Sequence, residues 1–269
     1  GADPINLGTG DTYTELGATA LDNIDGSFAA SIGGDSVNTA VPNTYIVTYD
    51  AVDAAGNHSI QVTRSVIVAD DDAPVIDAHG DESAEATSVS GAAVSYTAPN
   101  AVDNVDATFA ATCLPASGST FAVGDTVVTC NASDAALNAA TPTTFTVSVL
   151  DTTIPVIDAH GDETAEATSA SGAVVAYTPP NAIDIVDGSV PATCAPISGS
   201  TFAIGTTPVL CDYTDAHGNV AAQTTFNVIV SDSVAPVIDA HGNETAEATS
   251  ALGAIVTYTT TGMVLVRQI

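Results

Sequence analysis

The chain contains no lysine and no tryptophan, and its only arginines are Arg64 and Arg267. Against these two arginines stand 32 acidic residues, which give a formal net charge of −30. Nucleic acids and anionic membrane surfaces are recognised through basic patches, so this composition excludes both as natural partners. Carboxylates without positive counterparts repel one another unless cations screen or bridge them, so the charge favours a chain that binds cations.

Long apolar runs are also missing. No run reaches the roughly 20 residues that a helix needs to cross a bilayer, so we expect no membrane insertion. Residues 1–4 include neither a methionine nor an apolar leader, and we expect that a signal peptide has been removed or that the sequence is a fragment. Because 45% of residues are hydrophobic and only 13% are charged, the chain does not have the composition of a disordered acidic tail.

A repeat organises the whole sequence. The segment Pro74–Gly80 recurs at Pro155–Gly161 and again at Pro236–Gly242, so the period is 155 − 74 = 236 − 155 = 81 residues. Self-similarity at a fixed period is typical of tandem structural units. We therefore predict domains at residues 1–71, 72–152 and 153–233, followed by a partial fourth repeat at 234–269.

Apolar and polar residues alternate within each repeat. Phe145, Val147 and Val149 are separated by threonine and serine, and the same pattern recurs one period later. Alternation with a period of two is typical of half-buried antiparallel strands, and Gly, Pro, Asn and Asp separate the runs. The sequence predicts an all-β chain of tandem immunoglobulin-like β-sandwiches in an elongated string.

The ordered motifs of the second and third repeats resemble the hyalin-repeat (HYR) family. In the third repeat these motifs are the segment 166–169, the loop 184–188, Cys194, Cys211 and the loop 215–219. The first repeat, through residues 15–20 and 45–49, is similar to a cysteine-free bacterial Ig-like surface domain. Both resemblances imply Ig-like sandwiches in proteins of extracellular adhesion and surface architecture. Ala107 and Leu137 replace glycines of the HYR pattern, so we expect less regular loops in the second repeat.

The four cysteines also follow the repeat. They are Cys113, Cys130, Cys194 and Cys211. Three connectivities are possible, and the repeat favours Cys113–Cys130 and Cys194–Cys211 because equivalent positions should make equivalent contacts. The first repeat has Ile32 and Tyr49 at these positions. Disulfides indicate an oxidising compartment, so we expect a secreted, extracellular or cell-surface protein. A four-thiolate zinc site would need closely spaced cysteine pairs, which are lacking.

Each repeat carries an Asp-x-x-Asp motif and, 53 − 22 = 31 residues after its first aspartate, an Asp-x-x-x-Asn motif. On an Ig-like sandwich both motifs would lie in loops at one end, next to the incoming linker. Carboxylate and amide oxygens are the ligands that Ca²⁺ prefers, so we predict calcium at the junctions between repeats. The candidate ligands are Asp22, Asp25, Asp53, Asn57, Asp71, Asp103, Asp106, Asp134, Asn138, Asp151, Asp184, Asp187, Asp215, Asn219 and Asp232. Alternatively, these residues serve only as ordinary turn residues.

No pattern indicates catalysis. His79, His160 and His241 recur in the motif Asp-Ala-His-Gly, and three copies favour a structural turn over a catalytic residue. Phosphate loops, nucleophile elbows and H-E-x-x-H motifs are missing, and the paired carboxylates lack the aromatic platform of a glycosidase. We predict that the chain is not an enzyme.

The two ends of the repeat array do not match. The first repeat lacks a counterpart of Pro74–Asp81, whereas Pro236–Gly242 is a spare copy. One hypothesis is that the spare segment of one molecule completes the first repeat of the next, which would give a head-to-tail homopolymer by strand donation. Alternatively, Pro4–Leu7 forms the first repeat's own opening strand, or the partial repeat only reflects where the sequence ends.

The leading functional hypothesis is therefore an extracellular structural or adhesive protein, such as a stalk or filament subunit stiffened by calcium. Its partners would be further copies of itself or other extracellular proteins and glycans. A glycan- or protein-binding module and an accessory region of a secreted enzyme are the alternatives. Nearly identical repeats favour the structural role, because a recognition site usually makes the loops of one repeat diverge.

Overall fold

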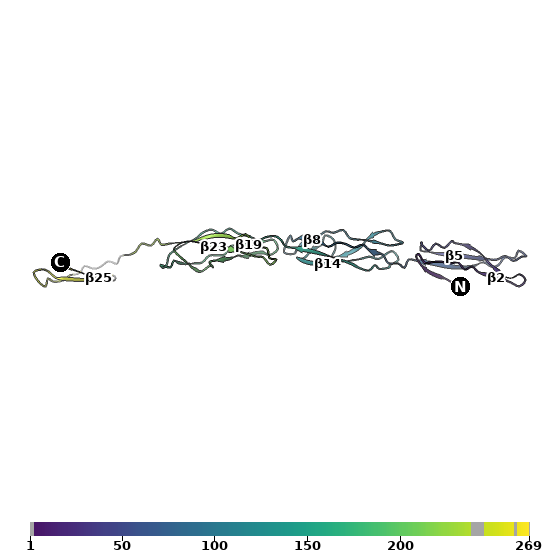
Figure 1. Ribbon diagram of the computed structural model, residues 1–269, viewed down its shortest axis with the longest axis horizontal. Helices are drawn as coiled ribbons and strands as arrows, with labels where there is room; N and C mark the ends of the chain where they lie inside the picture. The colour runs from purple at the N-terminus through teal and green to yellow at the C-terminus, as the bar shows by residue number, and fades with distance from the viewer. Residues whose placement is uncertain (1–2, 238–244, 261–262, 269) are drawn as a thin grey trace. The chain divides into compact units, whose positions relative to one another are not determined.

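A computed structural model describes residues 3–237, 245–260 and 263–268. All regular elements within these ranges are β-strands (Figure 1). Among the described residues, no helix is long and apolar enough to cross a membrane. The all-β prediction is thus confirmed.

The chain divides into two compact units. The first comprises Gly1–His160, Thr178–Ala195 and Leu210–Thr225, and the second comprises Gly161–Tyr177, Pro196–Val209 and Phe226–Ile269. The first unit thus holds two whole repeats and the acidic loops of the third. The division of the chain at residues 71, 152 and 233 stays a prediction.

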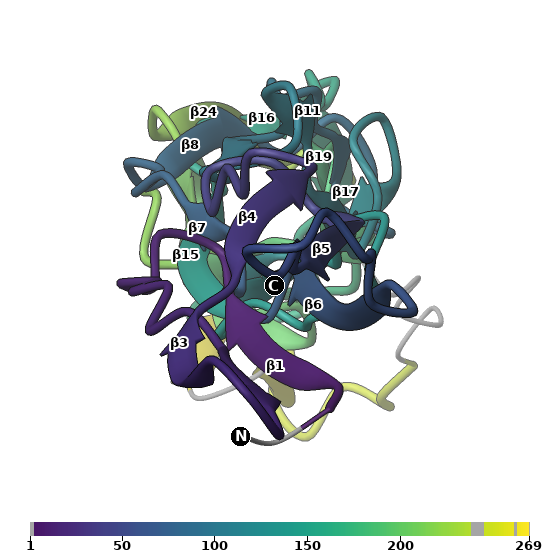
Figure 2. The same ribbon diagram turned by 90° about the vertical axis from the view of Figure 1, so that its right-hand side faces the viewer.

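The first repeat contains a four-stranded sheet in the order β1-β6-β5-β4, whose strands are labelled in Figure 2, and a separate β2–β3 hairpin. Its strands are β1 (Ile5–Gly8), β2 (Thr19–Asp22), β3 (Gly26–Ala29), β4 (Ser31–Gly34), β5 (Asn43–Asp50) and β6 (Val62–Ala69). β1 runs parallel to β6, with Ile5 opposite Val66. Residues 5–8 therefore give the four-stranded sheet its own edge strand.

The second repeat contains three sheets, in the orders β12-β14-β15-β8, β11-β10-β7 and β13-β9. Its strands are β7 (Val75–Ile76), β8 (Glu82–Glu85), β9 (Ala92–Ala93), β10 (Asn100–Val102), β11 (Phe109–Ala110), β12 (Thr112–Leu114), β13 (Thr120–Phe121), β14 (Gly124–Asn131) and β15 (Thr143–Leu150). Here β8 runs parallel to β15, as β1 does to β6. β7 adds a third strand to the hairpin, with Ile76 opposite Ala101. No described residue pairs with β2 in this way in the first repeat.

The third repeat has the same sheets, in the orders β17-β24-β23-β21, β16-β19-β20 and β18-β22. Its strands are β16 (Val156–Ile157), β17 (Glu163–Glu166), β18 (Ala173–Val175), β19 (Asn181–Asp184), β20 (Gly188–Pro191), β21 (Thr193–Ala195), β22 (Ser200–Phe202), β23 (Gly205–Asp212) and β24 (Thr224–Ser231). Beyond it, β25 (Ile255–Thr260) pairs antiparallel with β26 (Met263–Gln268).

The core of the second repeat lies between its sheets. Val147 and Val149 of β15 are fully buried, and Ser148 between them is not, as the period of two predicts. Ala101 of β10 and Ile76 of β7 belong to the same buried cluster. Because both sheets contribute to one core, the repeat is a β-sandwich, and the predicted fold class is confirmed.

Both disulfides form as predicted. Cys113 of β12 lies directly opposite Cys130 of β14, and the bond Cys113–Cys130 joins them. The bond Cys194–Cys211 joins β21 and β23 in the same way. All four cysteines are therefore paired.

The expectation of irregular loops in the second repeat is correct at one position and wrong at the other. Strand pairing continues to Gly26 in the first repeat and to Gly188 in the third, but it stops at Phe109 in the second, where Ala107 replaces the glycine. Leu137, by contrast, adopts the left-handed conformation with φ 74° that Gly218 also adopts. The backbone of that loop is kept, and leucine bears the conformational cost.

Candidate cation sites at the repeat junctions

The first aspartate of each Asp-x-x-Asp motif closes a tight turn. Oδ1 of Asp184 accepts hydrogen bonds from the amides of Val186 at 2.7 Å and Asp187 at 3.0 Å. Asp22 and Asp103 accept the equivalent pair of bonds. This is the local turn chemistry expected of aspartate, so the turn interpretation explains one oxygen of each carboxylate.

The second aspartate of the motif joins the two loops. Oδ2 of Asp187 accepts a hydrogen bond from the amide of Ala216 at 3.1 Å, and Asp106 does the same with Ala135 at 2.7 Å. These residues are 29 positions apart in the chain. The predicted convergence of the two loops at one end of the sandwich is therefore correct.

The Asp-x-x-x-Asn loop contributes its own network. Asp215 accepts bonds from the amide of Asn219 at 2.7 Å and from its Nδ2 at 2.8 Å. Nδ2 of Asn219 also donates to the carbonyl of Asp151 in the incoming linker, at 3.1 Å. Asn138 makes the same three bonds, to Asp134 and to the carbonyl of Asp70.

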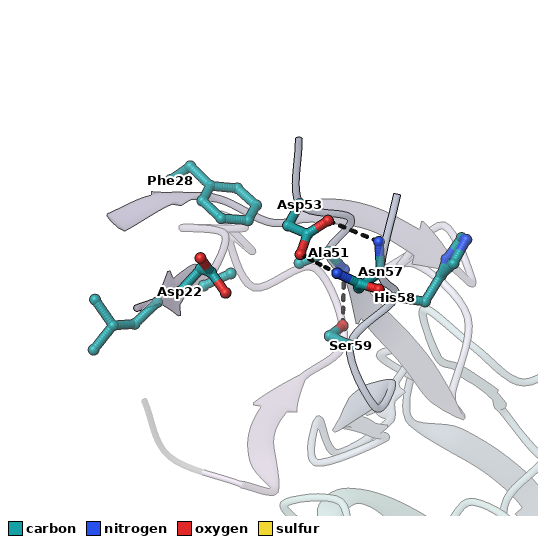
Figure 3. A pocket seen from close by; sticks show the side chains of 9 residues that line it. Asp22, Phe28, Ala51, Asp53, Asn57, His58 and Ser59 are labelled. Atoms are coloured by element: carbon teal, nitrogen blue, oxygen red, sulfur yellow. Dashed lines mark hydrogen bonds between the residues drawn. The ribbon is translucent and has the colours of Figure 1, made fainter. Parts of the chain in front are cut away.

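The first repeat has the loops of this arrangement in a more exposed form. Figure 3 shows Asp53 accepting two bonds from Asn57, with Asp22 nearby. Asp25 reaches the amide of Ala54 at 2.8 Å. Among the described residues, however, these aspartates do not form a compact group of three with a linker carboxylate.

Several carboxylate oxygens remain without a hydrogen-bond partner after these networks are complete. Among the described residues, the buried oxygens of this kind are Asp70 Oδ1, Asp103 Oδ2, Asp151 Oδ2 and Asp184 Oδ2. They belong to two clusters whose ligand atoms lie within 4.8 Å of one another: Asp70, Asp103 and Asp106, and Asp151, Asp184 and Asp215. Burying a carboxylate oxygen without a partner costs free energy, so a bound cation would stabilise each cluster.

The pKa values of the linker aspartates reflect this crowding. Burial raises the pKa of Asp151, and the neighbouring charge of Asp184 raises it further. Burial also raises the pKa of Asp70, followed by the charges of Asp103 and Asp134. Turn hydrogen bonds from Asp106 and Val105 lower the pKa of Asp103. The linker carboxylates therefore face negative potential, whereas the turn hydrogen bonds favour the ionised form of Asp103.

The predicted linker ligands Asp71 and Asp232 are not among the clustered carboxylates of the described residues. The structure brings Asp70, not Asp71, to the second repeat's loops. Asp70 is the residue 151 − 70 = 81 positions before Asp151, so the repeat register could have identified it. Asp232 is exposed and follows the third repeat, and its role as a ligand stays a prediction, since residues 238–244 lie outside the described part.

Two further polar groups were missed. His217 lies at the third repeat's cluster, with Nδ1 3.0 Å from Oδ2 of Asp151. In the first repeat, the carboxylate of Glu15 contacts Arg64 at 3.3 Å and accepts hydrogen bonds from Tyr49 and Tyr13. The sequence contains few arginines, and a half-buried arginine needs a carboxylate as its partner. This scarcity was the signal from which the pair of Arg64 and Glu15 could have been found.

Among the repeated histidines, His79 is a packing residue. Its ring lies 4.1 Å from the ring of Phe145, which in turn packs edge-on against Tyr96 at 5.0 Å. Such contacts between rings stabilise a core, as expected of a structural residue. His241 lies outside the described residues.

Comparison with known proteins gives the family. Residues 69–149 and 150–230 each match the HYR domain, and residues 1–68 match the bacterial surface protein Ig-like domain. The chain belongs to the HYR family. The resemblance inferred from the motifs is confirmed, and HYR and Ig-like repeats are adhesive modules of extracellular or surface proteins rather than enzymes.

Three relatives illustrate the similarity of these HYR repeats. Hyalin of Strongylocentrotus purpuratus is 33% identical over 84% of this chain, and hyalin of Lytechinus variegatus is 31% identical over 82%. The serine-rich adhesin for platelets of Staphylococcus aureus (strain MRSA252) is 35% identical over 42%. The chain spans 19%, 43% and 9% of these relatives, respectively.

Proposed function

We propose that this chain is an extracellular adhesive or structural segment whose repeat junctions bind Ca²⁺. Two buried oxygens carry the proposal, Asp151 Oδ2 and Asp184 Oδ2, which have no hydrogen-bond partner. The hydrogen bonds of the turns account for the loop geometry but leave these oxygens unexplained. A cation is the partner that the acidic surroundings favour.

Calcium suits the chemistry of these clusters. It takes six to eight oxygen ligands at about 2.3–2.6 Å, in flexible geometry, and water completes the shell. Asp151, Asp184 and Asp215 are all buried and supply three carboxylates from the linker and both loops. An ion held in this way would tie the linker to the repeat that follows it, and this would stiffen the junction.

The test is thermal unfolding of the chain in EDTA and in rising calcium. We expect the melting temperature to rise by several degrees with calcium, because an ion that binds only the folded state stabilises it. The substitution Asp151→Asn should remove the part of the shift that comes from the third repeat, while the cluster of Asp70, Asp103 and Asp106 still binds calcium. Asp22→Asn is the matched control, since Asp22 makes the same turn bonds outside any cluster. Equal melting temperatures in calcium and EDTA would refute the calcium site.

Adhesion is tested separately. Beads coated with the chain should aggregate in calcium and disperse in EDTA, and beads coated with the Asp151→Asn variant should aggregate less. If the coated beads neither aggregate nor retain extracellular proteins or glycans, the adhesive role is wrong for this segment.

A second candidate function is assembly by strand donation, and the open edge of β2 favours it. In the second repeat, β7 pairs with β10 at Ala101, which is fully buried. The equivalent residue 101 − 81 = 20 has no such neighbour within the described part of the first repeat, and Leu21 beside it is 84% exposed. A pocket lined by Ala18, Ala20, Tyr49, Ile60 and others lies along this edge. The repeated sequence Pro-Val-Ile fits this place, and Pro236–Gly242 offers another copy of it.

Sedimentation of the intact chain tests assembly. Strand donation predicts species larger than a monomer that grow with concentration, and the substitution Ile238→Asp, which places a charge where the donated strand needs an apolar residue, should return them to monomers. Leu252→Asp is the control, because Leu252 is exposed and outside the donated motif. A monomer at all concentrations, or assembly that survives Ile238→Asp, would overturn the donation.

A further inference from the structure

One of the positions at which the acidic ends of the second and third repeats differ adds a possible metal ligand. The Asp-x-x-x-Asn loop of the third repeat contains His217, where the second repeat has Ala136, since 217 − 136 = 81. Histidine adds a nitrogen ligand to a set of carboxylates, and it changes which metals the set prefers.

His217 lies close to two carboxylates of the acidic end. Nδ1 lies 3.0 Å from Oδ2 of Asp151 and 3.9 Å from Oδ2 of Asp187. The three ligand atoms therefore converge from the linker and from both loops, and all lie within 4.8 Å of one another. Ligands of a tetrahedral zinc ion with bonds of about 2.0–2.1 Å are separated by roughly 3.3 Å, which lies between the two distances measured.

The contact between His217 and Asp151 is not an ordinary hydrogen bond. Oδ2 of Asp151 has no hydrogen-bond partner, and its close neighbour is Nδ1 of His217, which can pair with it as an ion when the imidazole is protonated. The Asp151 side chain is 0% exposed, so water cannot take the place of a partner. A metal ion bound between Nδ1 of His217 and Oδ2 of Asp151 would give the buried carboxylate oxygen a partner.

We propose that Asp151, Asp187 and His217 form a binding site for a divalent transition metal of the Zn²⁺ class. Two carboxylate oxygens, one imidazole nitrogen and a water molecule would complete four-coordinate geometry. The site shares Asp151 with the proposed calcium cluster, so the two ions compete for that oxygen, but zinc binding does not require that calcium binds. The junction before the second repeat has no equivalent nitrogen and binds hard cations alone.

Isothermal titration of the untagged chain with Zn²⁺, in the absence of calcium, tests the proposal. We expect zinc binding in the wild type and its loss in His217→Ala, which converts the loop to the residue of the second repeat. His58→Ala is the matched control, because His58 is an exposed histidine beside the corresponding loop of the first repeat and should leave zinc binding unchanged. Co²⁺ should give visible absorption bands in the wild type that His217→Ala removes, which reports ligation by the imidazole.

Each outcome has a defined meaning. Zinc binding that is the same in the wild type and His217→Ala, or missing from the wild type, overturns the proposal. A calcium effect on melting that persists in His217→Ala supports the calcium proposal whatever the zinc result is. Zinc binding without any calcium effect supports the transition-metal site and refutes the calcium function.

Discussion

The first repeat and the two repeats that follow it have the same four-stranded sheet but hold it together differently. At positions related by the repeat, the pair Glu15 and Arg64 of the first repeat replaces Tyr96 and Phe145 of the second. Ile32 lies opposite Tyr49 on β4 and β5, where the second repeat has a disulfide. The sheet therefore tolerates a charged network or an aromatic and disulfide core, provided that each buried group finds its partner.

Removal of a disulfide should give the largest difference between these repeats. Replacing both Cys194 and Cys211 with alanine should lower the free energy of unfolding of the third repeat by about 3 kcal/mol, because the bond no longer restricts the unfolded chain. The first repeat has no cysteine and should not respond. Hydrogen exchange measured peptide by peptide, with and without reductant, separates the two. If hydrogen exchange accelerated as much in the first repeat as in the third, the disulfide would not stabilise the third repeat alone, and the prediction would be wrong.

A glycine that recurs at the same position of the repeats should tolerate substitution differently in the first and the third repeat. A Cβ on Gly172, where φ is 105°, would overlap the carbonyl oxygen of Phe202, whereas a Cβ on the equivalent Gly10 meets no atom within 4 Å. We expect Gly172→Ala to cost about 2–3 kcal/mol and Gly10→Ala clearly less, since only the backbone conformation is strained there. Chemical denaturation of the two variants checks this, and equal costs would show that the overlap relaxes.

The charged network of the first repeat should respond to acid. Burial alone would raise the pKa of Glu15, but hydrogen bonds from Tyr13, Tyr49 and Gly17 and the charge of Arg64 lower it below its ordinary value of 4.5. A lowered pKa stabilises the folded state above the unfolded pKa, and this stabilisation is lost as pH falls through the folded pKa.

Glu15→Gln should therefore reduce the stability of the first repeat by about 2 kcal/mol at neutral pH and by much less near pH 2. Hydrogen exchange of peptides that cover β5 provides the measurement. Burial and the hydrogen bond that Tyr49 donates to Glu15 raise the pKa of Tyr49 to about 12, so this tyrosine stays neutral between pH 2 and neutral pH. A loss that does not depend on pH would contradict the role of the charge.

The smallest expected effect concerns the loop in which the second repeat departs from glycine. Leu137 has φ 74° and is 83% exposed, so its side chain gains little from packing and its backbone is strained. Leu137→Gly should stabilise the second repeat by about 1 kcal/mol. Gly218→Leu in the third repeat is the reciprocal change and should destabilise by a similar amount. Urea denaturation of both variants tests whether the two loops are interchangeable.

Much of this could be predicted because the repeat fixed equivalences between residues. The alternation of Phe145, Val147 and Val149 predicted β15, and the cysteine spacing predicted both disulfides. What escaped prediction depends on contacts between segments. Ile5 lies opposite Val66 as Glu82 lies opposite Val147, although the period of 81 would put residue 1 at that place. One of the alternatives from the sequence placed an opening strand at Pro4–Leu7, but its register with β6 is set by hydrogen bonds that no motif encodes.

The acidic ends show the same limit. Sequence predicted which loops converge, but the charges of the three adjacent aspartates before the second repeat do not distinguish them. The period of 81 points to Asp70, and this is the residue that lies at the loops. His217 did not stand out, because a single histidine among five carries no pattern of its own. Its neighbours Asp151 and Asp187 are distant in the chain, so their approach is a property of the tertiary structure.

The parallel pairing of the outer strands has a mechanical consequence. In each repeat an early strand, β1, β8 or β17, runs parallel to the last long strand, β6, β15 or β24. Tension that pulls the start and the end of a repeat in opposite directions then slides these strands along each other, so several hydrogen bonds must break together instead of one after another. Once the strands separate, the second and third repeats each retain the loop that their disulfide closes, between cysteines 17 residues apart. This loop cannot be pulled straight, so each of these repeats releases less length. The first repeat has no such loop and would extend further.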